Sequence, residues 1–219
     1  DAAVIDGFTI TGGHATAPGN DLGGGLFNSN NSNPKLYNCL FTRNTAGRGG
    51  AIYNYRSSSR THHCRFVDNA ATISGGAIHG SGSLVEMHIT DSVFEDCFCE
   101  GWGGAIHNND AIVRLENCRL VNNTAWKFGN TRGGAVNNDN GSQAVLRFCT
   151  LAGNVSDNEG GAIRNENSDL AMENCILWDN EDETGKTLQA QYHVISGSVT
   201  AAYTCMMGWN PGVSGAGNF

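Results

Sequence analysis

The sequence predicts an all-β protein folded as a single right-handed parallel β-helix, a solenoid of about eight coils with three strands in each. Three observations predict it. A cysteine-centred phrase recurs along the chain, a Gly-Gly phrase recurs between its copies, and both alternate apolar with polar residues over strand-length segments. We therefore expect one β-helix domain covering residues 1–219, with almost no α-helix.

The cysteine phrase has the form Cys-x-apolar-x-x-Asn. Successive cysteine positions are 25 to 31 residues apart, a period typical of solenoids with insertions of variable length. Residues 92–97 fit the same frame, with serine in place of cysteine and cysteine in place of asparagine. The cysteines and asparagines of the phrase are Cys39, Cys64, Cys118, Cys149, Cys175 and Cys205, and Asn44, Asn69, Asn123, Asn154, Asn180 and Asn210.

The Gly-Gly phrase supplies a second strand to each period, and an apolar position three residues before most cysteines supplies a third. Leucine-rich repeats have a similar period, but they need a dense leucine framework and a following helix, which this chain lacks. Eight coils at the ~4.8 Å spacing of paired strands give a rod of about 40 Å. The phrase begins at Gly23, Gly49, Gly75, Gly103, Gly133 and Gly160, and the third position holds Leu36, Ile89, Leu115, Leu146 and Met172.

In such a solenoid each residue stacks on its counterpart one coil along, so a recurring position becomes a ladder. Cysteine is small and readily buried, which suits a narrow interior column. Stacked asparagine amides can hydrogen-bond between coils at a corner, and the glycine pair permits backbone angles that a side chain forbids. The interior column next to the cysteines is expected to hold Phe41, Phe66, Phe94, Leu120, Leu151, Leu177 and Met207.

Composition excludes several classes of partner. The net charge of −8 and the pI of about 5.2 argue against a nucleic-acid-binding surface. No apolar run approaches the roughly 18 residues that a membrane helix requires, so we expect no membrane insertion. The chain begins inside an apparent strand without a leader, which is typical of a piece of a larger precursor.

One column on the outward face of the Gly-Gly strand, away from the core, is a candidate binding surface. Aromatic and imidazole rings in a row on a flat, solvent-facing strand could stack on sugar rings or hold a protein partner. We therefore take Tyr53, His79 and His107 as candidate ligand-binding residues; a metal shared by the two histidines is a weaker alternative, and a solvent-facing ladder without a ligand is the simplest interpretation. The column contains Phe27, Tyr53, His79, His107, Asn137 and Arg164.

The carboxylates do not suggest a catalytic site. They recur at fixed repeat positions, which favours solvated ladders over the opposed acids of a glycosidase or the Ca²⁺-binding aspartates of a lyase. The acidic loop at residues 179–186 could hold Ca²⁺, but its spacing matches no calcium motif. We predict no catalytic residue, no metal site and no cofactor. The recurring carboxylates are Asp68, Asp96 and Asp179, and Glu116 and Glu173.

The cysteines are expected to be mostly free and buried, because parallel in-register strands orient neighbouring thiols poorly for disulfides. Cys97 and Cys99 fall outside the cysteine column, so they are the pair expected to be exposed or to oxidise. Four Asn-x-Ser/Thr sequons raise the question of glycosylation, which the sequence leaves open. They begin at Asn30, Asn122, Asn140 and Asn154.

The paired GGAI and F-x-x-N phrases resemble the repeats of the chlamydial polymorphic outer-membrane proteins. The segments AVIDGFTITGG and GGGLFNSNNSNPKLYNCLFTRNTA also resemble secreted right-handed β-helix repeat proteins of environmental bacteria. The resemblance covers nearly the whole chain and implies surface display, adhesion or extracellular scaffolding; related β-helices include pectate lyases. Compared with a complete member, we expect this chain to lack an amphipathic N-terminal cap, an autotransporter barrel and a sorting domain.

These observations favour a non-enzymatic structural protein, extracellular or on the cell surface. Both ends of the solenoid are expected to present open strand edges without a helical or charged cap, so copies could associate head to tail into a fibre. Two alternatives remain: a carbohydrate-binding adhesin that contacts glycans or cell-surface proteins, and a polysaccharide lyase or glycoside hydrolase.

Overall fold

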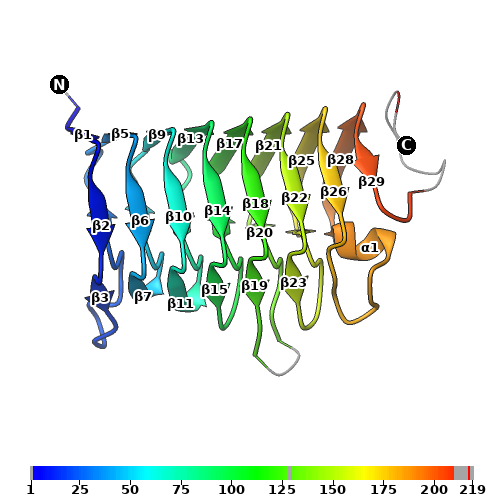
Figure 1. Ribbon diagram of the computed structural model, residues 1–219, viewed down its shortest axis with the longest axis horizontal. Coiled ribbons are helices and arrows are strands. Elements are labelled where there is room, and N and C mark those ends of the chain that lie inside the picture. Colours follow the sequence, from blue (N-terminus) through cyan, green and yellow to red (C-terminus); the bar gives the residue numbers. More distant parts are fainter. Residues whose placement is uncertain (1, 128–129, 210–216, 218–219) are drawn as a thin grey trace.

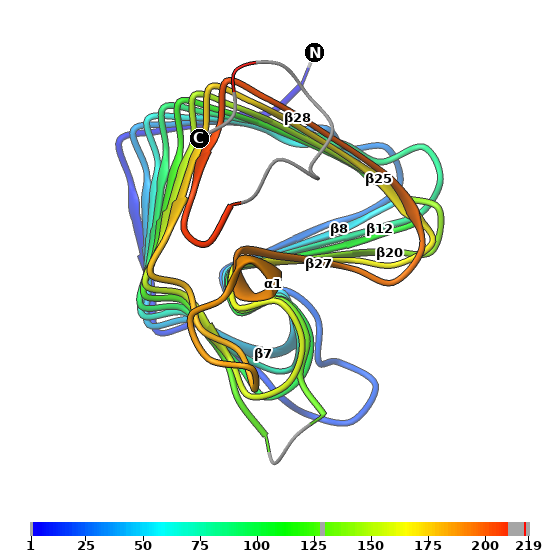
Figure 2. The same cartoon turned by 90° about the vertical axis from the view of Figure 1, so that its right-hand side faces the viewer.

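The computed structural model describes residues 2–127, 130–209 and 217, and it confirms the predicted all-β solenoid. Parallel strands stack along the long axis of a rod, one coil after another (Figure 1). Viewed from the C-terminal end, the chain turns counterclockwise as it approaches the viewer, so the solenoid is right-handed (Figure 2).

Each full coil contributes a strand to each of four parallel sheets, not three. The first sheet contains β1 (Val4–Asp6), β5 (Lys35–Tyr37), β9 (Arg60–His62), β13 (Glu86–Thr90), β17 (Ile112–Glu116), β21 (Gln143–Arg147), β25 (Ser168–Glu173) and β28 (Gly197–Ala202). The second contains β2 (Thr9–Thr11), β6 (Leu40–Thr42), β10 (Arg65–Val67), β14 (Val93–Glu95), β18 (Arg119–Val121), β22 (Thr150–Ala152), β26 (Ile176–Trp178) and β29 (Cys205–Met206).

The third sheet is the one that the sequence did not predict. It contains β3 (His14–Ala15), β7 (Thr45–Arg48), β11 (Ala70–Ser74), β15 (Phe98–Cys99), β19 (Thr124–Ala125) and β23 (Val155–Ser156). Most of these strands are only two residues long, too short for an alternating pattern to emerge. The fourth sheet contains β4 (Leu26–Asn28), β8 (Ile52–Tyr55), β12 (Ile78–Ser81), β16 (Ile106–Asn109), β20 (Val136–Asp139), β24 (Ile163–Asn165) and β27 (Tyr192–Val194).

The corners between sheets are single residues in the left-handed conformation. In each coil such a residue stands after the strand of the first sheet and after the strand of the second. Others stand before and after the strand of the fourth sheet. Glycine, asparagine and aspartate adopt this conformation at the lowest cost. The corner after the second sheet is made by Gly12, Arg43, Asp68, Asp96, Asn122, Gly153, Asp179 and Gly208. Asp68, Asp96 and Asp179 therefore recur because they turn the chain.

The cysteine column forms a hydrogen-bonded ladder inside the corner between the first two sheets. The Cys39 amide donates to Sγ of Cys64 (3.4 Å), and the Cys64 amide donates to Oγ of Ser92 (3.1 Å). Sγ of Cys64 in turn donates to the carbonyls of Leu36 and His62. The position therefore requires a small side chain that can both donate and accept a hydrogen bond, and serine meets this requirement as well as cysteine does. Its cysteines are free and buried: Cys39, Cys64, Cys118, Cys149 and Cys175.

The last coil departs from the predicted register by one residue. Cys205 pairs with Ile176 and Met206 with Leu177, so Thr204 and not Cys205 occupies the cysteine ladder. Oγ1 of Thr204 accepts the amide of the preceding cysteine, and its side chain is fully buried. The prediction for Cys205 was therefore wrong, and Met206 replaces Met207 in the interior column.

A corner glycine explains the shift in the last coil. Gly208 has φ = 75° and occupies the left-handed corner after the second sheet, as Asp179 does with φ = 58°. The predicted register would have placed Trp209 at that corner, where a bulky side chain is disfavoured. Asn210, the last member of the predicted asparagine column, lies outside the described residues.

The asparagine column forms a second buried ladder, at the corner between the second and third sheets. Nδ2 and the amide of Asn123 both donate to Oδ1 of Asn154 (3.0 Å each), and Asn154 donates in the same way to Asn180 (2.9 Å). Nδ2 of Asn154 also donates to the carbonyl of Leu120. Asn44 and Asn69 are linked in the same manner.

The Gly-Gly phrase ends in a second asparagine ladder, which the sequence analysis missed although the residue recurs there. Nδ2 of Asn28 donates to Oδ1 of Asn54 (2.7 Å), and Asn108 donates to Asn138 at the same distance. Asn138 continues the ladder to Asn165 (2.6 Å). These amides satisfy backbone groups where the fourth sheet turns into the first.

Cys97 and Cys99 are both fully buried and free, so the expectation that they are exposed was wrong. Cys97 takes an asparagine's place in the first asparagine ladder, where its amide donates to Oδ1 of Asn123 (3.1 Å). Cys99 stands between Ala71 and Ala125 in the small-residue column of the third sheet. Burial raises the pKa of each thiol to about 12, which suppresses the reactive thiolate.

The end of the rod carries a helix that was not expected. Helix α1 (Leu188–Gln191) lies at the C-terminal end of the coils (Figures 1 and 2). Oε1 of Gln191 accepts a hydrogen bond from Nδ2 of Asn180 (2.8 Å), which ends the first asparagine ladder. This part of the end is capped, contrary to the prediction of uncapped ends. No helix among the described residues is long and apolar enough to cross a membrane.

The aromatic and aliphatic column of the second sheet is the centre of the core. The rings of Phe41 and Phe66 stack at 5.0 Å between centroids, and those of Phe66 and Phe94 at 4.6 Å. Leu36 and the other residues of the third apolar position pack against this column from the first sheet. The interior columns predicted from the phrases are thus confirmed, apart from the last coil.

Candidate functional site

The candidate binding column lies on the fourth sheet, on the face turned away from the core. Its rings stack as predicted: the centroids of Tyr53 and His79 are 4.8 Å apart, and those of His79 and His107 are 4.7 Å apart. The expectation of a solvent-facing row was wrong, because these three residues are only 7%, 3% and 1% exposed. Asn137 and Arg164 of the same column are also buried.

The covering side chains come from the residues that precede each Gly-Gly pair. The left-handed turn at the first glycine reverses the chain and brings a residue over the one five positions later. Ser74 thus covers His79 (Oγ to Nδ1, 2.7 Å), Trp102 packs edge-on against His107, and Glu159 binds Arg164 (2.7 Å). These covering residues pair as a parallel ladder of their own: Ser74, Trp102, Arg132 and Glu159.

His79 is a neutral imidazole in this setting. Burial holds the pKa of His79 well below its usual value, and the neighbouring His107 and Arg48 lower it further. Its hydrogen bond with Ser74 is therefore a bond between two neutral groups.

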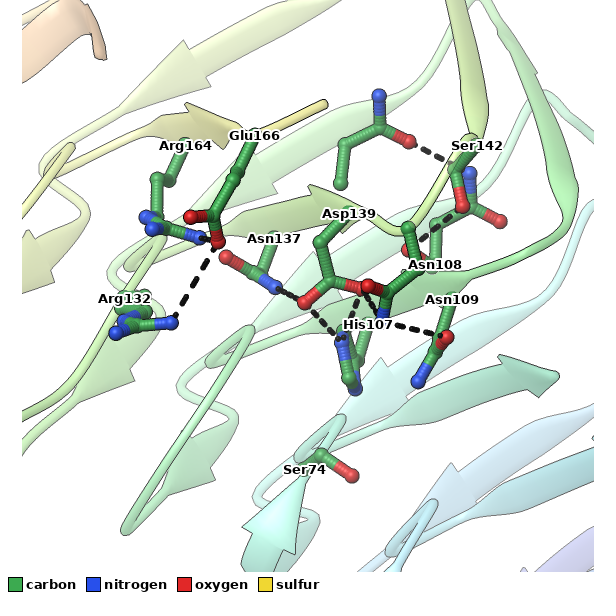
Figure 3. A network of polar contacts seen from close by, with 12 residues as sticks. Ser74, His107, Asn108, Asn109, Arg132, Asn137, Asp139, Ser142, Arg164 and Glu166 are labelled. Atoms are coloured by element: carbon green, nitrogen blue, oxygen red, sulfur yellow. Dashed lines mark hydrogen bonds and ion pairs between the residues drawn. The ribbon is translucent and has the colours of Figure 1, made fainter. Parts of the chain in front are cut away.

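His107 is bonded instead to an acid on the next coil. Nε2 of His107 lies 3.2 Å from Oδ2 of Asp139 (Figure 3), and Nδ2 of Asn137 donates to the same carboxylate oxygen (2.9 Å). Burial opposes the charge of Asp139, but the bonds from His107 and Asn137 outweigh it and lower the pKa of this carboxyl. Nδ1 of His107 is buried and has no hydrogen-bond partner among the described residues.

The C-terminal part of the network consists of ion pairs. Arg164 is 2% exposed and pairs with Glu159 (2.7 Å) and Glu166 (2.8 Å). Arg132 lies 3.7 Å from Glu166 (Figure 3). Only Arg164 of the four is buried, and the two partly exposed glutamates compensate its charge, as a buried charge requires.

The network contains the components of an acid–base site but does not connect them. A nucleophilic serine needs a base that is itself oriented by an acid. Here Ser74 is bonded to His79, whereas Asp139 orients His107, and the two imidazoles meet edge to face. Ser74 is also only 1% exposed. The arrangement can stabilise the fold and fix its register.

The recurring glutamates lie in an exposed ladder, as predicted, and the structure adds that their charges alternate with an arginine. Arg147 pairs with Glu116 on one side and Glu173 on the other, and it forms an ion pair with Glu173 (3.3 Å). Two carboxylates of the acidic loop have partners within the loop: Lys186 binds Asp179 (2.7 Å), and Asp182 accepts the Thr184 amide (2.8 Å).

Three of the four sequon asparagines, Asn30, Asn122 and Asn140, are exposed corner residues. Asn154 is fully buried in its ladder, so the folded chain cannot accept a glycan there.

Within the part of the chain that the structure describes, one group of three side chains could hold a metal ion: His62, His63 and Asp91. It lies at the corner after the first sheet, in a different part of the coil from Tyr53 and His107, and the sequence analysis did not select it.

One comparison with known proteins gives a match. Residues 38–55 match the Chlamydia polymorphic membrane protein repeat. The chain is a parallel β-helix repeat protein. The matched segment contains the rungs Cys39, Asn44 and Ile52 together with the Gly-Gly turn, so the features shared with that repeat are those that build the coil. No curated protein and no solved structure gives a significant match.

The stability of this β-helix repeat protein is expected to fall as the pH decreases from 7 to 5. The pKa of His79 is lower in the folded chain than its unfolded value of about 6.5. Below pH 6.5 the unfolded chain therefore binds a proton at this histidine, whereas the folded chain does not. The stabilisation present above pH 6.5 is lost, and the free energy of unfolding falls by about 2 kcal/mol at pH 5. Urea denaturation at both pH values measures it.

The matched variant is His79→Asn, because Asn137 occupies the same column. It should remove about 2 kcal/mol of this pH dependence. An unchanged difference between pH 7 and pH 5 would assign the effect to other groups. Asp139, whose pKa is lowered, contributes in a separate window, where stability is lost as the pH falls below about 4.

Proposed function

We propose that this chain is a non-enzymatic structural segment of an extracellular or cell-surface protein, a stiff rod that spaces or displays other parts. The observation that supports the proposal best is the use of the recurring residues. Those of the two asparagine ladders and the cysteine ladder are buried and bonded to the next coil. The match to a repeat of Chlamydia membrane proteins supports the surface location.

An activity screen tests this against the alternative of a polysaccharide lyase or hydrolase. The purified chain is incubated with acidic and neutral polysaccharides, and unsaturated products and new reducing ends are measured. We expect none, because the buried acid and bases are paired internally. Product formation that disappears in Asp139→Asn or in Asp91→Asn would overturn the proposal.

Self-association into a fibre is the finer form of the proposal. Strands β1 and β28 are the outermost strands of the first sheet, and each pairs on one side only within the described residues. Val4 and Phe8, at the same end as β1, are 60% and 62% exposed. Such edges can pair with another copy. Helix α1 restricts the contact to the first, second and fourth sheets.

Light scattering over a range of protein concentrations tests the fibre. The expected result is growth into elongated particles that electron microscopy shows as filaments. Val4→Lys with Thr200→Lys places charges on both outermost strands of the first sheet and should keep the chain monomeric. Glu116→Lys, on an interior strand, is the control. A wild-type chain that stays monomeric at high concentration would refute the fibre but leave the rod.

The adhesin alternative has an aromatic surface at one end of the candidate column. Phe27 and Tyr55 are 47% and 40% exposed, and both stack on the buried ring of Tyr53. A glycan array distinguishes this alternative from the rod. Binding that is lost in Phe27→Ala with Tyr55→Ala would favour the adhesin, whereas loss in His79→Asn alone would reflect a change behind the surface.

A further inference from the structure

The corner after the first sheet brings together ligands that are distant in sequence. This corner is a column of left-handed residues, and consecutive members belong to consecutive coils. They are Gly7, Asn38, His63, Asp91, Asn117, Phe148, Asn174 and Tyr203. His63 and Asp91 are therefore neighbours, although 28 residues separate them. His62, the last residue of β9, is in register with Thr90, which precedes Asp91.

The three side chains converge closely enough to share one ion. Nδ1 of His62 lies 3.2 Å from Oδ2 of Asp91, and the ring centroids of His62 and His63 are 4.0 Å apart. One ligand atom from each residue lies within 4.8 Å of the others. Metal–ligand distances of about 2.0–2.2 Å place ligand atoms within this range of one another.

The surroundings orient the carboxylate and leave the outer side open. Nδ2 of Asn117 donates to Oδ1 of Asp91 (2.6 Å), and such an outer contact commonly fixes a ligand of a metal site. Thr90 Oγ1 lies 2.8 Å from Nδ1 of His62, and an ion bound at Nδ1 would replace this contact. Beside His63 and Asp91 lies a surface depression of about 420 Å³ that Arg119 also lines. It provides space for water or for a ligand from a partner.

We propose that His62, His63 and Asp91 bind a late first-row divalent transition metal ion, for which Zn²⁺ is the probe. Two imidazoles and one carboxylate suit such an ion and do not suit Ca²⁺ or Mg²⁺, which prefer oxygen ligands. The ion joins two coils at the point where Ser92 interrupts the cysteines of their ladder. A simple His–Asp ion pair would account for the position of the His62 side chain but not for the His63 ring beside it, since other residue types also make this corner.

Isothermal titration with ZnCl₂ tests the site, with CaCl₂ as the comparison. The expected result is one saturable Zn²⁺ per chain, no Ca²⁺ binding and a higher midpoint of thermal unfolding with Zn²⁺. His63→Asn and Asp91→Asn should weaken binding at least tenfold. Both variants preserve the corner, because asparagine already occupies it in other coils. Asn117→Gly should weaken binding by about tenfold through the carboxylate orientation.

His14→Ala, an exposed histidine on another sheet, is the control and should bind Zn²⁺ as the unaltered chain does. Co²⁺ substitution separates this site from the cysteines, since a site of nitrogen and oxygen ligands gives no thiolate charge-transfer band. The proposal is overturned if Zn²⁺ binding does not saturate, or if a thiolate band appears at the first equivalent. It is also overturned if His63→Asn and Asp91→Asn bind Zn²⁺ as tightly as the unaltered chain.

Discussion

Replacing Gly134 with alanine is expected to destabilise the folded chain by roughly 4 kcal/mol or more, a large fraction of the total stability of a typical domain. A Cβ atom at this position would lie 2.1 Å from the carbonyl oxygen of Gly161 and 2.5 Å from that of Val155. Both are backbone atoms of the neighbouring coil, so neither can rotate away. The second glycine of the phrase is therefore required for close contact between coils.

Gly141→Ala is the matched control, because it tests the cost of an unfavourable backbone angle without a steric clash. Gly141 has φ = 80°, which disfavours alanine, but a Cβ there would meet nothing within 4 Å. We expect a loss of about 1 kcal/mol from Gly141→Ala. Urea denaturation followed by circular dichroism compares the two. If Gly134→Ala costs no more than Gly141→Ala, the close contact between coils is not what selects glycine.

Features that depend on one repeated position could be predicted from the sequence. The columns that contain Cys64, Phe66 and Asn69 were found because stacking makes a recurring residue type a structural position. The register of the last coil was not predicted correctly. Cys205 matched the phrase by residue type, but the left-handed corner at Gly208 determines how the strand pairs.

Features that depend on the path of the chain between phrases could not be predicted. Alternation placed Tyr53 and His79 on the outer face of their strands but could not show that the Gly-Gly turn folds the preceding residue over them. The cluster of His62, His63 and Asp91 was missed for a different reason. His63 and Asp91 each precede a rung of the cysteine ladder, in consecutive coils, but the residue type at this corner changes from coil to coil, so no repeated residue marked the position.

The first asparagine ladder should be the most sensitive polar feature of the fold, and Asn154→Leu is expected to cost about 3–5 kcal/mol. Oδ1 of Asn154 accepts the amide and Nδ2 of Asn123, and its Nδ2 donates to Leu120 and Asn180. Leucine has a similar shape but leaves these buried groups without partners. Equilibrium denaturation measures the loss. Asn158→Ala, at a partly exposed position, should change stability by less than about 0.5 kcal/mol.

Introducing an asparagine into the same ladder is expected to stabilise the fold. Cys97 occupies an asparagine position and offers no amide oxygen to Asn69, while its own amide already donates to Asn123. Cys97→Asn would give Asn69 an acceptor and provide a donor to the Phe66 carbonyl, which Sγ of Cys97 now contacts at 3.5 Å. We expect stabilisation of about 1 kcal/mol. Destabilisation by Cys97→Asn together with tolerance of Asn154→Leu would mean that the space in this column, and not its hydrogen bonding, determines which residue it accepts.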